Sequence, residues 1–257
     1  EIYTTRNTLS LHDALPIYLV GILNGIDVDA WDPATDKALP AQYHAHDLSG
    51  KVACKAALQN ELGWKEDAQI PLFGAVARLY DQKGLDLLAD ILDRVMASMQ
   101  VQVVVLGSGD PLIESRLKAA EGRYPDRIHV TIGFDEGLSR RIYGGSDFFV
   151  MPSRFEPCGL GQMYAMRYGA PPIVRSTGGL ADTVDQYEEK FHRGSGFRFE
   201  VPTQDALYFT LGWACSTFYD RPGDLKMLRE NGMEKDFSWK FSGRAYENLY
   251  RWAEDSR

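Results

Sequence analysis

The stretch SRFEPCGLGQMYAMRYGAPPIVRSTGGLADTV, residues 153–184, decides the fold class of this chain. An apolar run (147–152) precedes it, a second apolar run (171–175) lies inside it, and a polar, glycine-rich turn follows each run. Glu156 and Cys158 stand in the first of these turns. Apolar strands that each lead through such a turn into a helix-length segment are typical of a parallel α/β sheet.

The same alternation continues on the N-terminal side of that stretch. Three more short, β-branched runs predict buried strands at 71–77, 101–107 and 128–133. Helical spacing of apolar residues predicts a helix that contains Leu85, Leu88, Ala89, Leu92 and Met96. Further helices are predicted at 111–122, 136–144, 159–169, 203–220, 222–237 and 239–257. We therefore predict an α/β protein with a Rossmann-like parallel sheet and helices on both faces.

Composition narrows the classes of ligand. The 257 residues are 44% hydrophobic and 25% charged, as in an ordinary globular protein, and the formal net charge of −8 argues against an extended nucleic-acid surface. The three cysteines lack zinc or CxxC spacing. Neither a signal peptide nor an apolar run of about 18 residues is present in the sequence. We expect no metal, nucleic-acid or membrane partner. Because the chain is acidic overall, an anionic ligand could bind only at a small, local site.

In sheets of this kind ligands bind at the carboxyl ends of the strands, so the turn after each predicted strand is a candidate site. Arg78 and Lys83 follow the first strand beside a helix start, which suits a diphosphate, although a solvated basic loop is the alternative. After the third strand, Phe134 could stack on a base and Glu136 could accept ribose hydroxyls. An aromatic residue at a strand end is, however, more often part of a core.

The turns after the fourth and fifth strands hold the other candidates. Glu156 precedes a proline and is therefore disfavoured in the helical conformation. For Cys158, no histidine stands in a matching turn, so packing explains it better than nucleophilic catalysis. Backbone N–H groups are accessible at the glycines of both turns, Gly159, Gly161, Gly178 and Gly179. One such turn is commonplace, but several at one edge of a sheet indicate a binding site.

Together these residues resemble the glycogen and starch synthases, which are retaining glycosyltransferases of the GT-B fold that use ADP-glucose. The resemblance runs from about Tyr18 to about Trp252 and is closest to the C-terminal, nucleotide-sugar-binding half of that family. It rests, in the family's order and spacing, on GILNGID (21–27), ARLYDQKGLDLL (77–88), LGSGD (106–110), SRFEPCGL (153–160), YAMRYGAPPIVRSTGGLADTV (164–184) and DFSWKFSGRAYENLY (236–250).

The resemblance implies a role for each of these turns. Arg78 and Lys83 match two cations on the donor diphosphate, Glu156 matches the acidic residue at the transferred glucose, and these three are the implied catalytic residues. Phe134 matches an aromatic residue stacked on adenine. The other implied donor-binding positions are Asn24, Gly25, Glu136, Cys158, Gly159, Leu160, Gly161, Thr177, Gly178 and Gly179.

The implied reaction transfers glucose from ADP-glucose to the non-reducing end of an α-1,4-glucan with retention. Cations and helix N-termini stabilise the negative charge that develops on the leaving ADP. The sequence shows no pair of carboxylates like that of a retaining hydrolase, so attack from the leaving-group side is favoured. No metal or other cofactor is implied.

The chain departs from the family pattern at a few positions. Tyr164 stands where many related transferases, though not the glycogen synthases, have a second glutamate. Gly161 replaces a common threonine, and Arg140 replaces a common histidine. The family's Lys-x-Gly-Gly-Leu motif, which belongs to the N-terminal domain and the acceptor side, does not occur.

We therefore interpret 18–238 as the donor-binding domain and 239–257 as a helix that would cross back to an N-terminal domain. Residues 1–17 are unplaced and are interpreted as foreign. On this interpretation the chain alone binds ADP or ADP-glucose weakly and elongates no glucan, because acceptor contacts come from the other domain. The expected location is the bacterial cytoplasm, with a plastid as the alternative.

Three alternatives stay open at this point. The first is a retaining transferase that uses a UDP- or GDP-sugar, and the second is a non-catalytic nucleotide-binding module. The third, an NAD oxidoreductase, is disfavoured because Leu112 stands where the dinucleotide fingerprint that begins at GSG (107–109) needs its third glycine.

Overall fold

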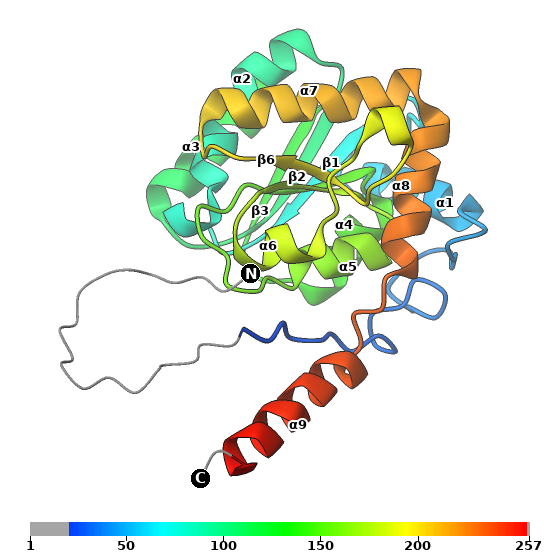
Figure 1. Cartoon of the computed structure of the whole chain (residues 1–257). Helices are drawn as coiled ribbons and strands as arrows, with labels where there is room; N and C mark the ends of the chain where they lie inside the picture. Colours follow the sequence, from blue (N-terminus) through cyan, green and yellow to red (C-terminus); the bar gives the residue numbers. More distant parts are fainter. Residues whose placement is uncertain (1–20, 256–257) are drawn as a thin grey trace, which may run out of the picture.

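A six-stranded parallel sheet with helices on both faces forms the centre of the computed structural model, which describes residues 21–255 (Figure 1). Its order is β3-β2-β1-β4-β5-β6, and every pair of neighbours is parallel. The strands are β1 Leu72–Val76, β2 Gln102–Gly107, β3 Ile128–Ile132, β4 Phe148–Met151, β5 Pro172–Arg175 and β6 Phe197–Phe199. The predicted fold class is thus confirmed, and the five predicted strands agree to within one residue at each end.

The helices occupy the segments between strands and the C-terminal third of the chain. They are α1 Ser49–Glu61, α2 Leu85–Ser98, α3 Pro111–Arg123, α4 Glu136–Gly145, α5 Gly161–Arg167, α6 Gly178–Thr183, α7 Gln204–Asp220, α8 Pro222–Glu234 and α9 Trp239–Asp255, with short 3₁₀ helices η1 Asp81–Lys83 and η2 Glu189–Phe191. Helices α1 and α6 and strand β6 were not predicted from the sequence. Only three residues long, β6 carries too little pattern to be recognised.

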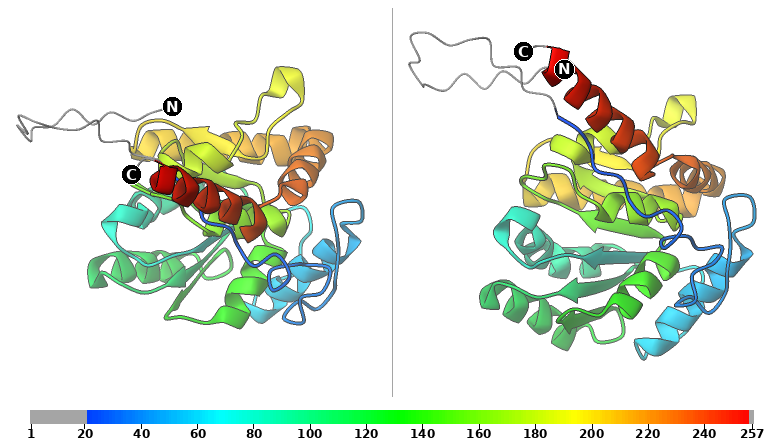
Figure 2. Two further views of the ribbon diagram at one scale, coloured as in Figure 1. Left: turned by 60° about the horizontal axis from the view of Figure 1, so that its bottom comes forward. Right: turned by 90° about the horizontal axis from the view of Figure 1, so that it is seen from below.

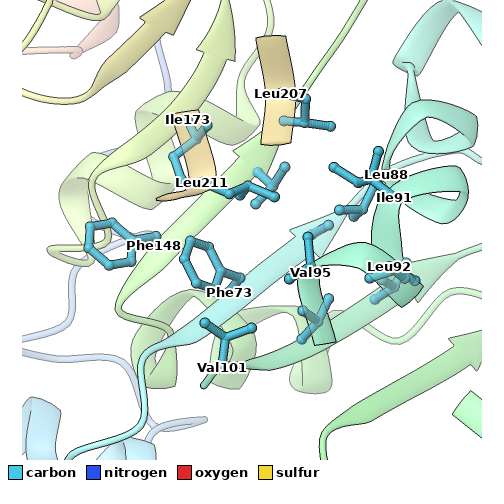
Figure 3. Packing of buried hydrophobic residues seen from close by; sticks show 14 of the residues in the cluster. Phe73, Leu88, Ile91, Leu92, Val95, Val101, Phe148, Ile173, Leu207 and Leu211 are labelled. Carbon is cyan, nitrogen blue, oxygen red and sulfur yellow. The ribbon is translucent and has the colours of Figure 1, made fainter. Parts of the chain in front are cut away.

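Alternate side chains of the four central strands, β1, β2, β4 and β5, point into different hydrophobic cores. In β4, Phe148 packs with α2, α7 and α8 on one face, whereas Phe149 packs with α1, α4 and α5 on the other. Figure 3 shows the first of these cores, where Phe73 and Phe148 face Leu88 and Leu211. Because both faces of these central strands are covered, they are apolar along most of their length, which is why they were recognisable as continuous runs.

The direction of strand addition reverses between β1 and β4. The chain adds β2 and β3 on one side of β1, then returns to place β4 on the other side, with Phe73 opposite Phe148. The connections leaving β1 and β4 therefore depart toward opposite sides of the sheet, and a crevice opens between the carboxyl ends of these two strands. Doubly wound sheets bind their ligands at this topological switch point.

Helix α9 projects away from the body of the molecule, beside the segment at 21–25 (Figures 1 and 2). The Ile26 N–H donates to the Phe237 carbonyl oxygen at 2.8 Å and ties that segment to the start of the helix. Within α9 only Ser242 is buried, while Phe241 and Tyr250 are 74% and 67% exposed. The segment at 1–17, interpreted above as foreign, lies outside the described residues.

Candidate functional site

A cavity of about 460 Å³ occupies the crevice between the carboxyl ends of β1 and β4. Most of the residues predicted for the donor site line it, namely Asn24, Arg78, Lys83, Glu156, Cys158, Gly159, Leu160 and Gly161. They come from three chain segments, which the topology brings to the carboxyl ends of the strands. The structure therefore brings together the two predicted cations, the predicted carboxylate and the first glycine turn.

Lys83 and Glu156 form a buried ion pair in this cavity. The Lys83 Nζ lies 2.5 Å from Glu156 Oε2, and these side chains are only 17% and 6% exposed. The Ser153 hydroxyl donates to the same carboxylate oxygen at 3.3 Å. Because an ion in such a place requires a partner, each side chain holds the other in position. A phosphate that enters the cavity would share Lys83 with Glu156.

Arg78 is the exposed cation of the site. In the described part of the chain it has no ion-pair partner, and its guanidinium lies 6.0 Å from the ring centre of Tyr80. Arg78 is the second residue after β1, whereas Lys83 ends η1 and precedes Gly84, which has a positive φ of 69°. The two cations thus differ physically, since one is already paired and the other is available to an incoming anion.

A second guanidinium group clamps the turn after β4 to the turn after β1. Arg154 Nη1 and Nη2 donate to Asp86 Oδ1 and Oδ2 at 2.7 and 2.6 Å. In addition, the Arg154 N–H donates to the Gln82 carbonyl oxygen at 2.8 Å. Partial burial alone would raise the pKa of Asp86, but hydrogen bonds and the charge of Arg154 outweigh it and lower that pKa below its ordinary value. The clamp fixes the distance between the segments that carry Lys83 and Glu156.

We expect this clamp to make stability depend on pH in the acid range. A lowered pKa contributes stability above the ordinary aspartate pKa of about 4, and this contribution is lost as the pH falls through the lowered value. Thermal unfolding followed from pH 7 to pH 2 should therefore show a steeper acid decline for the native chain than for Asp86→Asn. The control is Asp205→Asn, since that carboxylate is 72% exposed, and it should retain the native slope. Equal slopes for all three would contradict the role of the clamp.

The turn after β5 packs against the backbone of the turn that carries Glu156. Gly178 has a φ of 44°, and a Cβ there would lie 2.2 Å from the Glu156 carbonyl oxygen. The Gly179 N–H donates to that same oxygen at 3.1 Å. Thr177, Gly178 and Gly179 therefore do not line the cavity, but the last two contact the backbone of the residues that do. A side chain at position 178 would push the Glu156 turn out of place.

Other predicted residues lie outside the cavity. Phe134, at the end of β3, is 88% exposed, so its ring is accessible but is not held against the cavity. Glu136, the carboxylate expected to accept ribose hydroxyls, already accepts a hydrogen bond from Arg140 at 2.9 Å. Gly25 packs against the backbone of Trp239, where an added Cβ would lie 2.6 Å from the nitrogen. For these three positions a ligand role stays a prediction.

An aromatic stack beside the site was not predicted. The rings of Trp31 and Tyr164 are stacked with centroids 3.9 Å apart, and the Arg140 guanidinium lies 4.1 Å from the Trp31 ring centre. Tyr164, which takes the place of the second glutamate of other transferases, thus helps to hold the loop around Trp31 against α5. No local pattern could reveal this contact, because Trp31 lies in an irregular loop. Ser153, by contrast, directly follows a predicted strand and could have been found.

Chemically, the cavity offers two cations, one carboxylate and a glycine turn, which suit an anionic ligand rich in hydroxyl groups. Its lining includes no histidine among the described residues, so Cys158 has no imidazole base there. No cluster of three or more potential metal ligands occurs within 21–255. None of the helices in this range is long and apolar enough to cross a membrane.

Residues 70–207 match the sequence profile described as "Glycosyl transferases group 1", and the chain belongs to this family of glycosyltransferases. Within it, the chain is 53% identical to a glycogen synthase of Anaeromyxobacter dehalogenans, over 98% of this chain and 53% of that protein. It is 48% identical to glycogen synthase 1 of Geobacter sulfurreducens, over 90% of this chain and 46% of that protein. The chain thus spans about half the length of the curated relatives it matches.

Solved structures agree with this assignment. The catalytic domain of starch synthase IV from Arabidopsis thaliana, bound to ADP and acarbose, superimposes with a TM-score of 0.84 and 40% identity, over 90% of this chain and 48% of that one. A glycosyltransferase from Rickettsia africae shares the fold with a TM-score of 0.67, at 18% identity. The resemblance to the glycogen and starch synthases and to the C-terminal half of a GT-B protein is confirmed.

Proposed function

We propose that this chain is the donor-binding half of an enzyme that transfers glucose from ADP-glucose to an α-1,4-glucan with retention of configuration. One observation carries the proposal, namely the buried pair of Lys83 and Glu156 beside the exposed Arg78 at the topological switch point. The diphosphate of a nucleotide sugar needs cations, and its sugar hydroxyls need an acceptor such as a carboxylate. A donor site therefore needs both kinds of group next to each other. The ADP in the starch synthase IV structure, which is 40% identical to the chain, supports the choice of nucleotide.

The geometry suggests how such a site would act. As the bond between glucose and phosphate breaks, negative charge accumulates on the leaving ADP, where Arg78 and Lys83 would stabilise it. Glu156 would accept a hydrogen bond from a glucose hydroxyl and would orient Lys83 through their existing contact. The cavity contains one carboxylate rather than a pair, which favours attack from the leaving-group side over a glycosyl-enzyme intermediate.

Calorimetric titration with ADP, UDP and NAD tests the nucleotide part of the proposal. We expect saturable binding of ADP to the isolated chain, weaker binding of UDP and none of NAD. A preference for UDP would favour the alternative of a UDP-sugar transferase. Tight NAD binding would overturn the assignment of the cavity.

A second experiment tests catalysis. With ADP-glucose and a glucan primer, the chain alone is expected to produce no elongation, because the proposed acceptor contacts come from a second domain. Addition of the N-terminal half of the Anaeromyxobacter dehalogenans relative should restore measurable transfer. Elongation by the isolated chain would refute the two-domain part of the proposal. Nucleotide binding without transfer in the reconstituted pair would favour a non-catalytic binding module.

A further inference from the structure

A second cavity, of about 550 Å³, lies next to the amino end of β4, at the other end of the strands from the first cavity. Helices α1 and α8, the end of α7 and the loop at 45–48 border it, on the side of the molecule where α1 and α8 are labelled in Figure 1. It shares no lining residue with the cavity that contains Lys83 and Glu156. Any ligand here would therefore be distinct from the proposed sugar donor.

Positive charge exceeds negative charge in this second cavity. Its lining contains two carboxylates, one of them the exposed Asp47, and four cations, namely Lys51, Lys55, Lys226 and Arg229. The other carboxylate, Asp147, is buried and already forms ion pairs with two of the cations. Its Oδ2 lies 2.7 Å from Lys55 Nζ, and its Oδ1 lies 2.6 Å from Arg229 Nη2. With every lysine and arginine counted as charged and the lining residue His46 counted as neutral, the formal surplus is two positive charges, which matches a dianion.

Part of this surplus is located on a buried group. Lys51 is 3% exposed and donates to the carbonyl oxygens of Gly144 and Tyr168 at 2.9 and 2.7 Å, but it has no carboxylate partner in the described residues. Burial, and next the charge of Arg229, lower the pKa of Lys51 to about 7. Buried charges are normally paired, and here the pairing is incomplete. An anion in the cavity would complete it.

Two cations are placed to contact such an anion directly. The Lys226 side chain is 67% exposed, and its nearest carboxylate partner, on Glu230, is 3.6 Å away. The Arg229 side chain is 17% exposed and donates to Asp147 through Nη2, while its Nε is inaccessible and has no hydrogen-bond partner. The lining also includes the apolar residues Phe218, Pro222 and Leu225, the last two on α8 like Lys226 and Arg229. The cavity thus combines cations with apolar surface.

We propose that this cavity binds a phosphate group, either as inorganic phosphate or as part of a small phosphate ester, with Lys226 and Arg229 as its direct contacts. Lys51 and Lys55 add positive charge behind them. A dianion fits the surplus, and phosphate oxygens accept the charge-assisted hydrogen bonds that these side chains donate. The carbon part of an ester would lie against Phe218 and Leu225.

Calorimetric titration of the full chain with inorganic phosphate and with glycerol phosphate tests this proposal. We expect saturable binding that is weakened about tenfold by Lys226→Gln and by Arg229→Gln, since each removes one charge-assisted contact. Tighter binding of the ester would identify an organic phosphate as the ligand, and equal binding would identify free phosphate. Lys226 is exposed, so its replacement leaves folding intact, and circular dichroism verifies folding of the Arg229 variant.

Arg78→Ala separates the two cavities, because Arg78 belongs only to the proposed donor site. This variant should lose only phosphate binding at the donor cavity and should keep the binding that Lys226→Gln and Arg229→Gln weaken. Phosphate binding that is lost in Arg78→Ala but kept in Lys226→Gln and Arg229→Gln would assign the ligand to the donor cavity and overturn the proposal. Absence of saturable binding of both probes to the folded native chain would overturn it as well.

Discussion

Replacing Asp147 with alanine is expected to lower the free energy of unfolding by about 3–5 kcal/mol, the usual cost of removing one partner from a buried ion pair. Asp147 is 5% exposed and contacts Lys55 and Arg229, which are themselves largely buried. Its Oδ2 also accepts the Leu72 N–H at 2.9 Å, so the same carboxylate ties α1 and α8 to the start of β1. Its loss would leave two cations and one N–H unpaired.

Urea unfolding followed by circular dichroism measures this difference. The matched control is Asp205→Ala, because the Arg94–Asp205 pair is exposed, with side chains 46% and 72% accessible. That variant should change the free energy of unfolding by less than about 1 kcal/mol. If the two variants lost similar amounts, the Asp147 network would be no more important to the fold than a surface ion pair.

Arg78→Ala and Lys83→Ala are each expected to weaken ADP binding by about 10- to 100-fold, which corresponds to one lost charge-assisted contact with a phosphate. Their effects on folding should differ. Lys83→Ala leaves the buried Glu156 carboxylate without its cation and should cost about 1–3 kcal/mol of stability, whereas the exposed Arg78 has no ion pair to lose.

Calorimetry with ADP and urea unfolding, applied to the same preparations, separate these effects. Lys190→Ala is a suitable control, since this exposed lysine lies outside both cavities and contacts the ring of Phe191. It should change neither ADP affinity nor stability appreciably. Full ADP affinity in either the Arg78 or the Lys83 variant would remove that residue from the proposed diphosphate site.

The sequence was sufficient for the local features of this fold. Continuous apolar runs such as 101–107 predicted strands correctly, because a strand covered on both faces has no polar alternation to confuse the pattern. Residues in the turns after strands, Arg78 and Glu156 among them, were correctly assigned to one end of the sheet, because all strands of a parallel sheet end on the same side. The three-residue β6 was missed since so short a segment has no period.

What the tertiary structure decided is which of these elements meet. Lys83 and Glu156 are 73 residues apart, and they pair only because β4 is placed beside β1 rather than beside β3. The same placement leaves Phe134 and Glu136 outside the lining of the cavity, although they too follow a strand. The stack of Trp31 on Tyr164 and the cations around Asp147 likewise join distant segments. Sequence patterns report the burial and conformation of neighbouring residues, whereas strand order and side-chain partners depend on the packing of the whole chain.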